Sequence, residues 1–202
     1  MQKKGMKTFT LVLFLVVLGV LGYYIHLTNG APGHEDVTPS SEKDILLQYD
    51  MVADYPKTVR ETVKLHCRYL KYTYNTGLTK ECSEDDVFVL NQKMRQLFDD
   101  ELLDLNTPEK QLEALKKDIL LYQSNKQKFV SYTLAEPSQI EYNTEGDTEY
   151  AKMTVNVAMT MDGASFAMDE EYILRKNQEG QWKILGWMVV GQDKQNVEEE
   201  EK

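Results

Sequence analysis

The chain has 202 residues, 42% of them hydrophobic, so it can hold one domain with a substantial core and a shorter appendage. Acidic residues outnumber basic ones 33 to 23, and the formal net charge is −10. Binding to nucleic acid requires a basic stripe that neutralises phosphates. With this charge balance we expect neither such a stripe nor a nucleic-acid partner.

The N-terminal part contains an uncharged apolar run from Phe9 to Ile25, preceded by Lys3, Lys4 and Lys7. A run of this length is typical of a helix that crosses a lipid bilayer. The position of the lysines favours a single-pass cell-membrane protein, with the N-terminus in the cytoplasm and the C-terminal domain outside. A cleaved signal peptide is the alternative, although residues 29–31 make a poor cleavage site.

Composition divides the rest of the chain. We expect a basic stub and membrane anchor at residues 1–28 and a flexible tether, rich in Gly, Pro, Ser and Thr, at 29–43. A folded domain is expected at 44–191. The acidic residues 192–202 are expected to form a disordered tail.

Helical periodicity predicts three helices in the first half of the domain. The first covers residues 56–77, the second is capped by Ser83 and ends near Leu105, and the third opens at Thr107. A short amphipathic piece at residues 45–52 is a further candidate.

The second half of the domain shows the two-residue periodicity of strands. Short strands are predicted at residues 129–134 and 138–142, and a long one at 150–161 ends at the turn Asp162-Gly163. Helices followed by an antiparallel meander predict an α+β fold, with three helices packed on the sheet after a transmembrane helix.

The Asp162-Gly163 turn fixes the register of the strands on either side of it. The predicted pairs are Met161–Ala164, Met159–Phe166, Val157–Met168, Val155–Glu170, Met153–Tyr172 and Ala151–Leu174. In the next hairpin, the register that keeps apolar residues opposite one another predicts the pairs Leu174–Trp182, Tyr172–Ile184, Met168–Met188 and Phe166–Val190.

Trp182 and Trp187 are an odd number of residues apart in the last predicted strand, so their side chains are expected on opposite faces of the sheet. Trp182 then belongs to the core face, on which the helices pack. On the outer face we predict an interface formed by Trp187, Leu185, Val189 and Ile173. Its cover is either an earlier part of the chain or a second subunit or partner protein.

Glu170 is a charged residue on the predicted core face, between Val155 and Gly186. Because Gly186 has no side chain, we predict a pocket lined by Glu170, Gly186 and Tyr172. A carboxyl group among apolar side chains has a raised pKa and could act as an acid or base. The alternatives are a bulge that turns Glu170 to water, or a pairing with a Lys or Tyr side chain.

Other patterns of catalysis and metal binding do not occur in the sequence. The three histidines lack metal-ligand spacing with a third donor, and there is no nucleophile motif or glycine-rich phosphate loop. Cys67 lies on the apolar side of its helix, where a buried, inert thiol is expected, and Cys82 lies in a loop. We predict no cofactor, metal or catalytic residue, and favour a non-enzymatic role.

The order of elements resembles a known fold. A helical half with D-Y-P-K-T-V-R-E-T-V-K and L-F-D-D-E-L-L-D-L-N-T-P-E, followed by a meander that closes on G-Q-W-K-I-L-G-W, is similar to the nuclear transport factor 2-like cone fold over residues 44–190. The chain also resembles an uncharacterised family of small, singly anchored envelope proteins of Gram-positive bacteria. This resemblance implies a curved sheet that encloses a cone, and it carries over no catalytic residue.

We therefore expect a membrane-tethered domain outside the cytoplasm that acts as a non-catalytic protein-interaction or scaffold module. Its expected partners are the lipid bilayer, through Phe9 to Ile25, and either a second copy or another envelope protein. The alternative is a small-molecule binder or enzyme that uses the cone pocket near Glu170. A passive spacer is a third reading.

Overall fold

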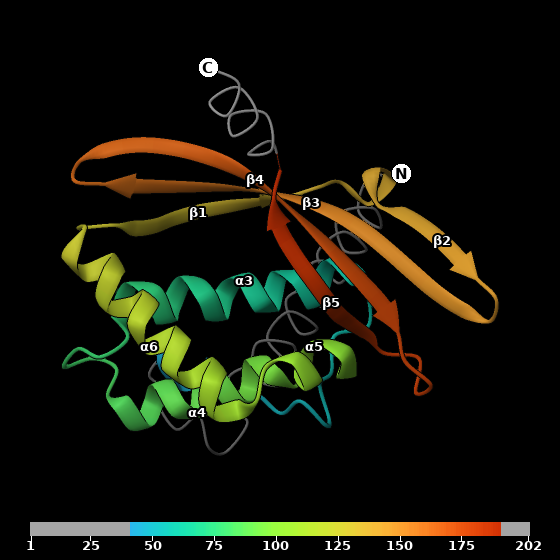
Figure 1. The fold of residues 1–202 in the computed structure, drawn as a ribbon, viewed down its shortest axis with the longest axis horizontal. Coiled ribbons are helices and arrows are strands. Elements are labelled where there is room, and N and C mark those ends of the chain that lie inside the picture. The colour runs from blue at the N-terminus through green and yellow to red at the C-terminus, as the bar shows by residue number, and fades with distance from the viewer. Residues whose placement is uncertain (1–40, 191–202) are drawn as a thin grey trace, which may run out of the picture. The chain divides into compact units, whose positions relative to one another are not determined.

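The computed structural model describes residues 41–190, which belong to one compact unit that begins at Ser41. Its centre is a five-stranded antiparallel sheet with the order β1-β3-β4-β5, in which β2 pairs with the first part of β3. The strands are β1 (Lys128–Leu134), β2 (Glu141–Glu145), β3 (Thr148–Met161), β4 (Ala164–Lys176) and β5 (Trp182–Val189). Figure 1 shows the helices gathered on one side of this sheet, which we call the inner face.

The helices are α2 (Glu42–Gln48), α3 (Val59–Thr76), α4 (Glu84–Arg95), α5 (Asp100–Leu105) and α6 (Pro108–Ser124), with a 3₁₀ turn η1 (Pro137–Gln139) between β1 and β2. The Thr107 hydroxyl accepts from the Lys110 N–H and caps α6, as predicted. A capping box of Thr58 and Glu61 starts α3. Helix α3 lies between the sheet and the layer of α4 and α6 (Figure 1).

The predicted helix from Ser83 to Leu105 is divided in two. After α4 the chain leaves the helix and runs beside β5, where the Ile184 N–H donates to the Leu97 carbonyl and the Asp99 N–H donates to the Ile184 carbonyl, both at 2.8 Å. These bonds occupy the outer edge of β5, which would otherwise lack partners. Sequence periodicity missed this break because Leu97 keeps the helical spacing of the apolar residues.

The fold prediction was therefore wrong in its helices. An α+β arrangement with helices on an antiparallel sheet is present, but within residues 41–190 five α-helices precede the sheet: α2 overlaps the short piece proposed at residues 45–52, and the predicted second helix is divided into α4 and α5. Within residues 41–190 no helix has the length and apolar character needed to cross a membrane. The predicted membrane segment at residues 9–25, like the acidic tail, lies outside the described residues.

The β3–β4 hairpin has the predicted register in all six pairs, from Met161–Ala164 to Ala151–Leu174. Asp162 and Gly163 both adopt positive φ angles, 46° and 88°. This is the backbone of a type I′ turn, which suits the right-handed twist of the strands and leaves no freedom in the register.

The predicted register of the β4–β5 hairpin was wrong. Trp182 pairs with Lys176, and Ile184 pairs with Leu174. A β-bulge follows, because Leu185 is an extra residue and the next pair is Ile173–Gly186. The extra residue reverses the side-chain alternation, so Trp187 pairs with Tyr172 and lies on the inner face together with Trp182.

The core fills the space between the inner face and α3. All inner-face residues in the middle of β3 are buried: Ala151, Met153, Val155, Val157 and Met159. Cys67 and Cys82 are both buried free thiols, and burial raises the pKa of Cys67 to about 12, so this thiol is inert as predicted. Because the core is complete within the unit, we expect the unit to fold without residues 1–40.

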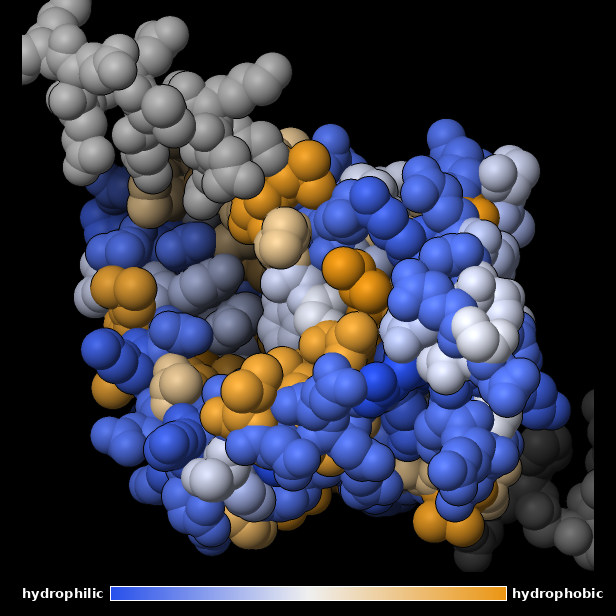
Figure 2. Space-filling view, turned by 45° about the vertical axis from the view of Figure 1, so that its right-hand side comes forward, coloured by the Kyte–Doolittle hydropathy of each residue, from blue (hydrophilic) through white to orange (hydrophobic). Residues whose placement is uncertain are grey.

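Hydrophobic side chains also reach the surface. Figure 2 shows a largely hydrophilic face with hydrophobic residues gathered across its middle. The exposed large apolar residues on the sheet include Met161, Phe166, Ile173, Trp187 and Met188. Phe166 lies near the start of β4, and Trp187 and Met188 lie on β5.

Candidate functional site

The helices stop covering the inner face partway across the sheet. On β3, Met159 is only 2% exposed, whereas its partner Phe166 on β4 is 37% exposed. Trp187 on β5 is also 37% exposed. We call five of the inner-face residues at this uncovered end the open strip; they are Phe166, Met168, Glu170, Trp187 and Val189.

Beside the open strip, β4 has a free backbone edge. Strand β5 ends at Val189, and the last bond between the two segments runs from the Val190 N–H to the Asp169 carbonyl, at 2.7 Å. Ser165 and Ala167 have the same orientation as Asp169, so their N–H and C=O groups point toward this edge. Nothing in residues 41–190 pairs with them. A free edge next to apolar side chains can accept another strand.

A short chain of polar groups leads from the open strip into the core. The Tyr172 hydroxyl donates to Glu170 Oε2 at 3.4 Å and lies 3.2 Å from His66 Nδ1. When the hydroxyl donates to Glu170, its oxygen is free to accept from His66, and this arrangement has the imidazole proton on Nδ1. Residues from α3 and β4 that are about a hundred positions apart thus form one hydrogen-bonded series.

The other nitrogen of His66 has no partner. His66 is fully buried, and among the described residues nothing forms a hydrogen bond with its Nε2 atom. The rings of Phe98 and Trp187 lie in T-shaped arrangements with the imidazole, with centroids 5.5 and 4.7 Å away. Burial lowers the pKa of His66 to about 3, so the ring is neutral near pH 7 and presents a bare lone pair to the aromatic residues.

The structure brings together two of the three predicted pocket residues. Glu170 and Tyr172 are hydrogen-bonded, and burial raises the pKa of Glu170 while the bond from Tyr172 opposes the rise. Gly186 pairs with Ile173 instead, and a Cβ atom built on it would meet nothing within 4 Å. Gly186 therefore does not lie beside Glu170, whose neighbours across the strands are Val155 and Val189.

The four predicted interface residues do not share one face. The bulge places Trp187 and Val189 on the inner face, whereas Ile173 lies on the outer face and Leu185 is the extra residue of the bulge. The outer face carries polar pairs, among them Lys152–Glu171 and Asn156–Asp169. The apolar outer face that we predicted around Trp187 is therefore not present.

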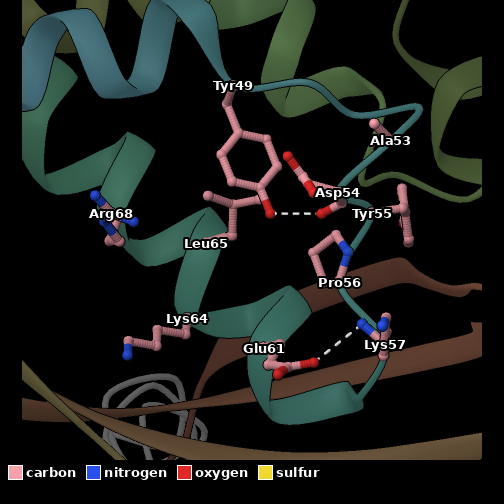
Figure 3. A pocket seen from close by; sticks show the side chains of 10 residues that line it. All are labelled: Tyr49, Ala53, Asp54, Tyr55, Pro56, Lys57, Glu61, Lys64, Leu65 and Arg68. Atoms are coloured by element: carbon pink, nitrogen blue, oxygen red, sulfur yellow. Dashed lines mark hydrogen bonds between the residues drawn. The ribbon is translucent and has the colours of Figure 1, made fainter. Parts of the chain in front are cut away.

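A second candidate surface follows the solvent side of α3. One groove of about 370 Å³ is bordered by Lys57, Glu61, Lys64, Arg68 and the segment from Tyr49 to Pro56, with Lys64 and Arg68 on successive turns of α3 (Figure 3). The Tyr49 hydroxyl donates to the Asp54 carbonyl across it, at 2.6 Å. The Glu61 carboxylate also lines this groove, where it accepts from the backbone N–H groups of Lys57 and Thr58.

A neighbouring groove of about 540 Å³ shares Lys64 and Arg68 with the first. It adds Lys71 and the rings of Tyr72 and Tyr132. Arg68 holds both carboxylate oxygens of Glu42 in this groove, each at 3.0 Å. The basic stripe that the net charge led us to exclude is thus present along α3.

A metal-binding site would require several ligand side chains close together. In the part of the chain that the structure describes, no three His, Cys, Asp or Glu side chains lie close enough to hold a metal ion. At the start of α5, the carboxylates of Asp99 and Glu101 form ion pairs with Arg175.

Comparison with known proteins gives one family. The family model described as "Domain of unknown function (DUF6715)" matches residues 1–187, so the chain belongs to this family. No curated protein matches the chain. The family description does not extend to a cone fold or an envelope location, and both of these stay predictions.

Proposed function

We propose that this member of the DUF6715 family is a protein-interaction module that self-associates by pairing the free edge of β4 with the same edge of a second copy. The observation that carries this proposal is the open strip beside a free backbone edge. Phe166 and Trp187 are 37% exposed at the end of the inner face that the helices leave uncovered, and the edge next to them offers the backbone groups of Ser165 and Ala167.

Backbone pairing and apolar burial would act together in this contact. An added strand satisfies N–H and C=O groups along the edge, and its side chains cover the apolar strip on one face. Natural proteins usually protect such edges with charged residues, proline or a covering segment. From Ala164 to Met168 the sequence is Ala-Ser-Phe-Ala-Met, which has no such protective residue.

A second copy fits this edge because two identical strands can pair in the antiparallel direction, so that each copy presents the same segment to the other. A two-fold axis near Ala167 would place Phe166 of each copy close to the pairing region, so one surface serves both partners. The polar outer face, with its paired charges, remains in water on both sides of the joined sheet.

Sedimentation equilibrium on residues 41–202 tests this proposal. Ala167→Pro removes the N–H group of Ala167 from the free edge. It leaves the hydrogen bonds between β4 and β3 in place, because the backbone N–H and C=O groups of Ala167 point away from β3. Ala167→Thr is the matched control, because it keeps the N–H and has a good strand propensity. We expect a dimer for the wild type and Ala167→Thr and a monomer for Ala167→Pro. A monomeric wild type, or a dimer that survives Ala167→Pro, would contradict the proposal.

A second candidate function rests on the partnerless Nε2 atom of His66. A small molecule with a hydrogen-bond donor could bind there if Trp187 moved aside, with Glu170 near the entrance as an acid or base. Screening small polar aromatic compounds by thermal shift, with His66→Phe as the control, tests this function. A compound that stabilises the wild type but not the variant supports it, and equal shifts in both proteins exclude binding at His66.

A further inference from the structure

Helix α3 and the residue before its cap carry an unusual concentration of positive charge. Residues 41–190 contain 26 acidic and 18 basic residues, yet the segment 57–71 has five basic residues and only one acidic one. They recur every three or four positions, so they lie along one side of the helix. We call this set the α3 row; its members are Lys57, Arg60, Lys64, Arg68 and Lys71.

Four of the five members of the α3 row, all except Arg60, border a long depression. The two grooves described above share Lys64 and Arg68, so they continue into one another along the helix. From Lys57 to Lys71 the helical rise gives a length of about 21 Å. An extended peptide of about six residues has the same length.

Much of this charge is not neutralised. Within the described residues Lys57, Lys64 and Lys71 take part in no ion pair. Arg68 does have a partner, the carboxylate of Glu42, which it holds in a bidentate arrangement. This pair shows which chemistry the groove accepts, because a glutamate side chain of the protein is already seated there.

We infer that the α3 row binds an acidic peptide segment of a partner protein in an extended conformation. Carboxylates of the peptide contact Lys64, Lys71 and Lys57, and its backbone lies against the rings of Tyr72 and Tyr132. Nucleic acid fits less well, because the excess of acid on the rest of the domain repels a long polyanion. This inference is independent of the β4 edge, so either can fail alone.

Fluorescence anisotropy with labelled hexaglutamate and residues 41–202 tests the inference. Lys64→Glu/Lys71→Glu reverses two charges of the row, and we expect at least about tenfold weaker binding. Lys110→Glu/Lys117→Glu is the matched control: it makes the same change in net charge at two exposed lysines outside both grooves, and binding should stay near the wild-type value. Equal weakening by both pairs would mean nonspecific attraction and would overturn the inference.

Glu42→Gln gives a test that loss of folding cannot imitate. The substitution removes the carboxylate that occupies Arg68, so hexaglutamate should bind several-fold more tightly. An unchanged or weaker affinity would contradict the inference. Free glutamate should compete poorly at the same carboxylate concentration, and full competition would assign the groove to small anions instead of a peptide.

Discussion

The two halves of β4 have the same alternating pattern but different surroundings. In the second half, Tyr172 and Leu174 are fully buried under α3 and beside β5. In the first half, Phe166 is 37% exposed, and β5 no longer runs alongside. One strand therefore contributes stability at one end and an accessible surface at the other, and the boundary lies at Glu170 and the series of hydrogen bonds that leads to His66.

The largest expected difference between the two halves is in the free energy of unfolding. Leu174→Ala should lower it by about 2–5 kcal/mol, because Leu174 is fully buried and its truncation would leave a cavity inside the core. Phe166→Ala should lower it less, by about 1–2 kcal/mol, because 37% of the residue is already exposed to water. Urea unfolding at low protein concentration measures both. Equal losses would mean that the first half of β4 is as well covered as the second.

The pH dependence of stability tests the buried end of the hydrogen-bonded series. The pKa of His66 is lowered in the folded state to about 3, so the unfolded chain binds a proton more readily. Above about pH 6.5 His66 is neutral in both states and does not affect the pH dependence of stability. As the pH falls from 6.5 toward 3, only the unfolded chain binds the proton, so the free energy of unfolding decreases. We expect several kcal/mol of acid destabilisation from this group.

His66→Phe should remove that part of the pH dependence and fit the same aromatic surroundings. Residues 41–190 contain no other histidine, so the comparison of urea unfolding at pH 7 and pH 4.5 is specific. The same loss of stability on acidification in both proteins would show that His66 is not buried in its neutral form.

Removing the Tyr172 hydroxyl should have a smaller effect. Tyr172→Phe leaves His66 Nδ1 and Glu170 without their common partner, and we expect a loss of about 1–3 kcal/mol. Tyr142→Phe is the control, because Tyr142 is exposed and should change stability by less than about 0.5 kcal/mol. Thermal unfolding of both variants checks the difference, which should vanish if the hydroxyl makes no bond.

The smallest effect is expected at the boundary itself. Burial raises the pKa of Glu170 in the folded state, so stability falls as the pH rises from the ordinary range of a carboxyl group through the raised pKa. Glu170→Gln removes the ionisation and should flatten this decline, with a gain at pH 7 smaller than the loss in Tyr172→Phe. A variant less stable than the wild type at pH 7 would show that the carboxylate is stabilised by its surroundings.

The two hairpins show what could be predicted from the sequence. Asp162-Gly163 allows one turn type and therefore one register, and the β3–β4 pairs were confirmed. The β4–β5 connection at residues 177–181 does not restrict the register in this way. The bulge at Leu185 then reverses the alternation, and a pattern of two cannot reveal an inserted residue. This single residue moved Trp187 from the predicted outer face to the inner one.

The candidate sites depended on information of two kinds. The series from His66 to Glu170 joins residues on α3 and β4, and only the packing of the helix on the sheet could bring them together. The α3 row was visible in the sequence as basic residues at helical spacing. It was missed because the net charge of the chain was taken to describe every part of its surface.

Amide hydrogen exchange along β4 tests the central claim most directly, because neighbouring residues serve as internal controls. The N–H groups of Phe166 and Met168 point to β3 and should be protected at every protein concentration. The N–H groups of Ser165 and Ala167 point to the free edge, and they should exchange rapidly in dilute samples and become protected as the concentration rises. Exchange at Ser165 and Ala167 that does not depend on concentration would contradict pairing of the β4 edge with a second copy.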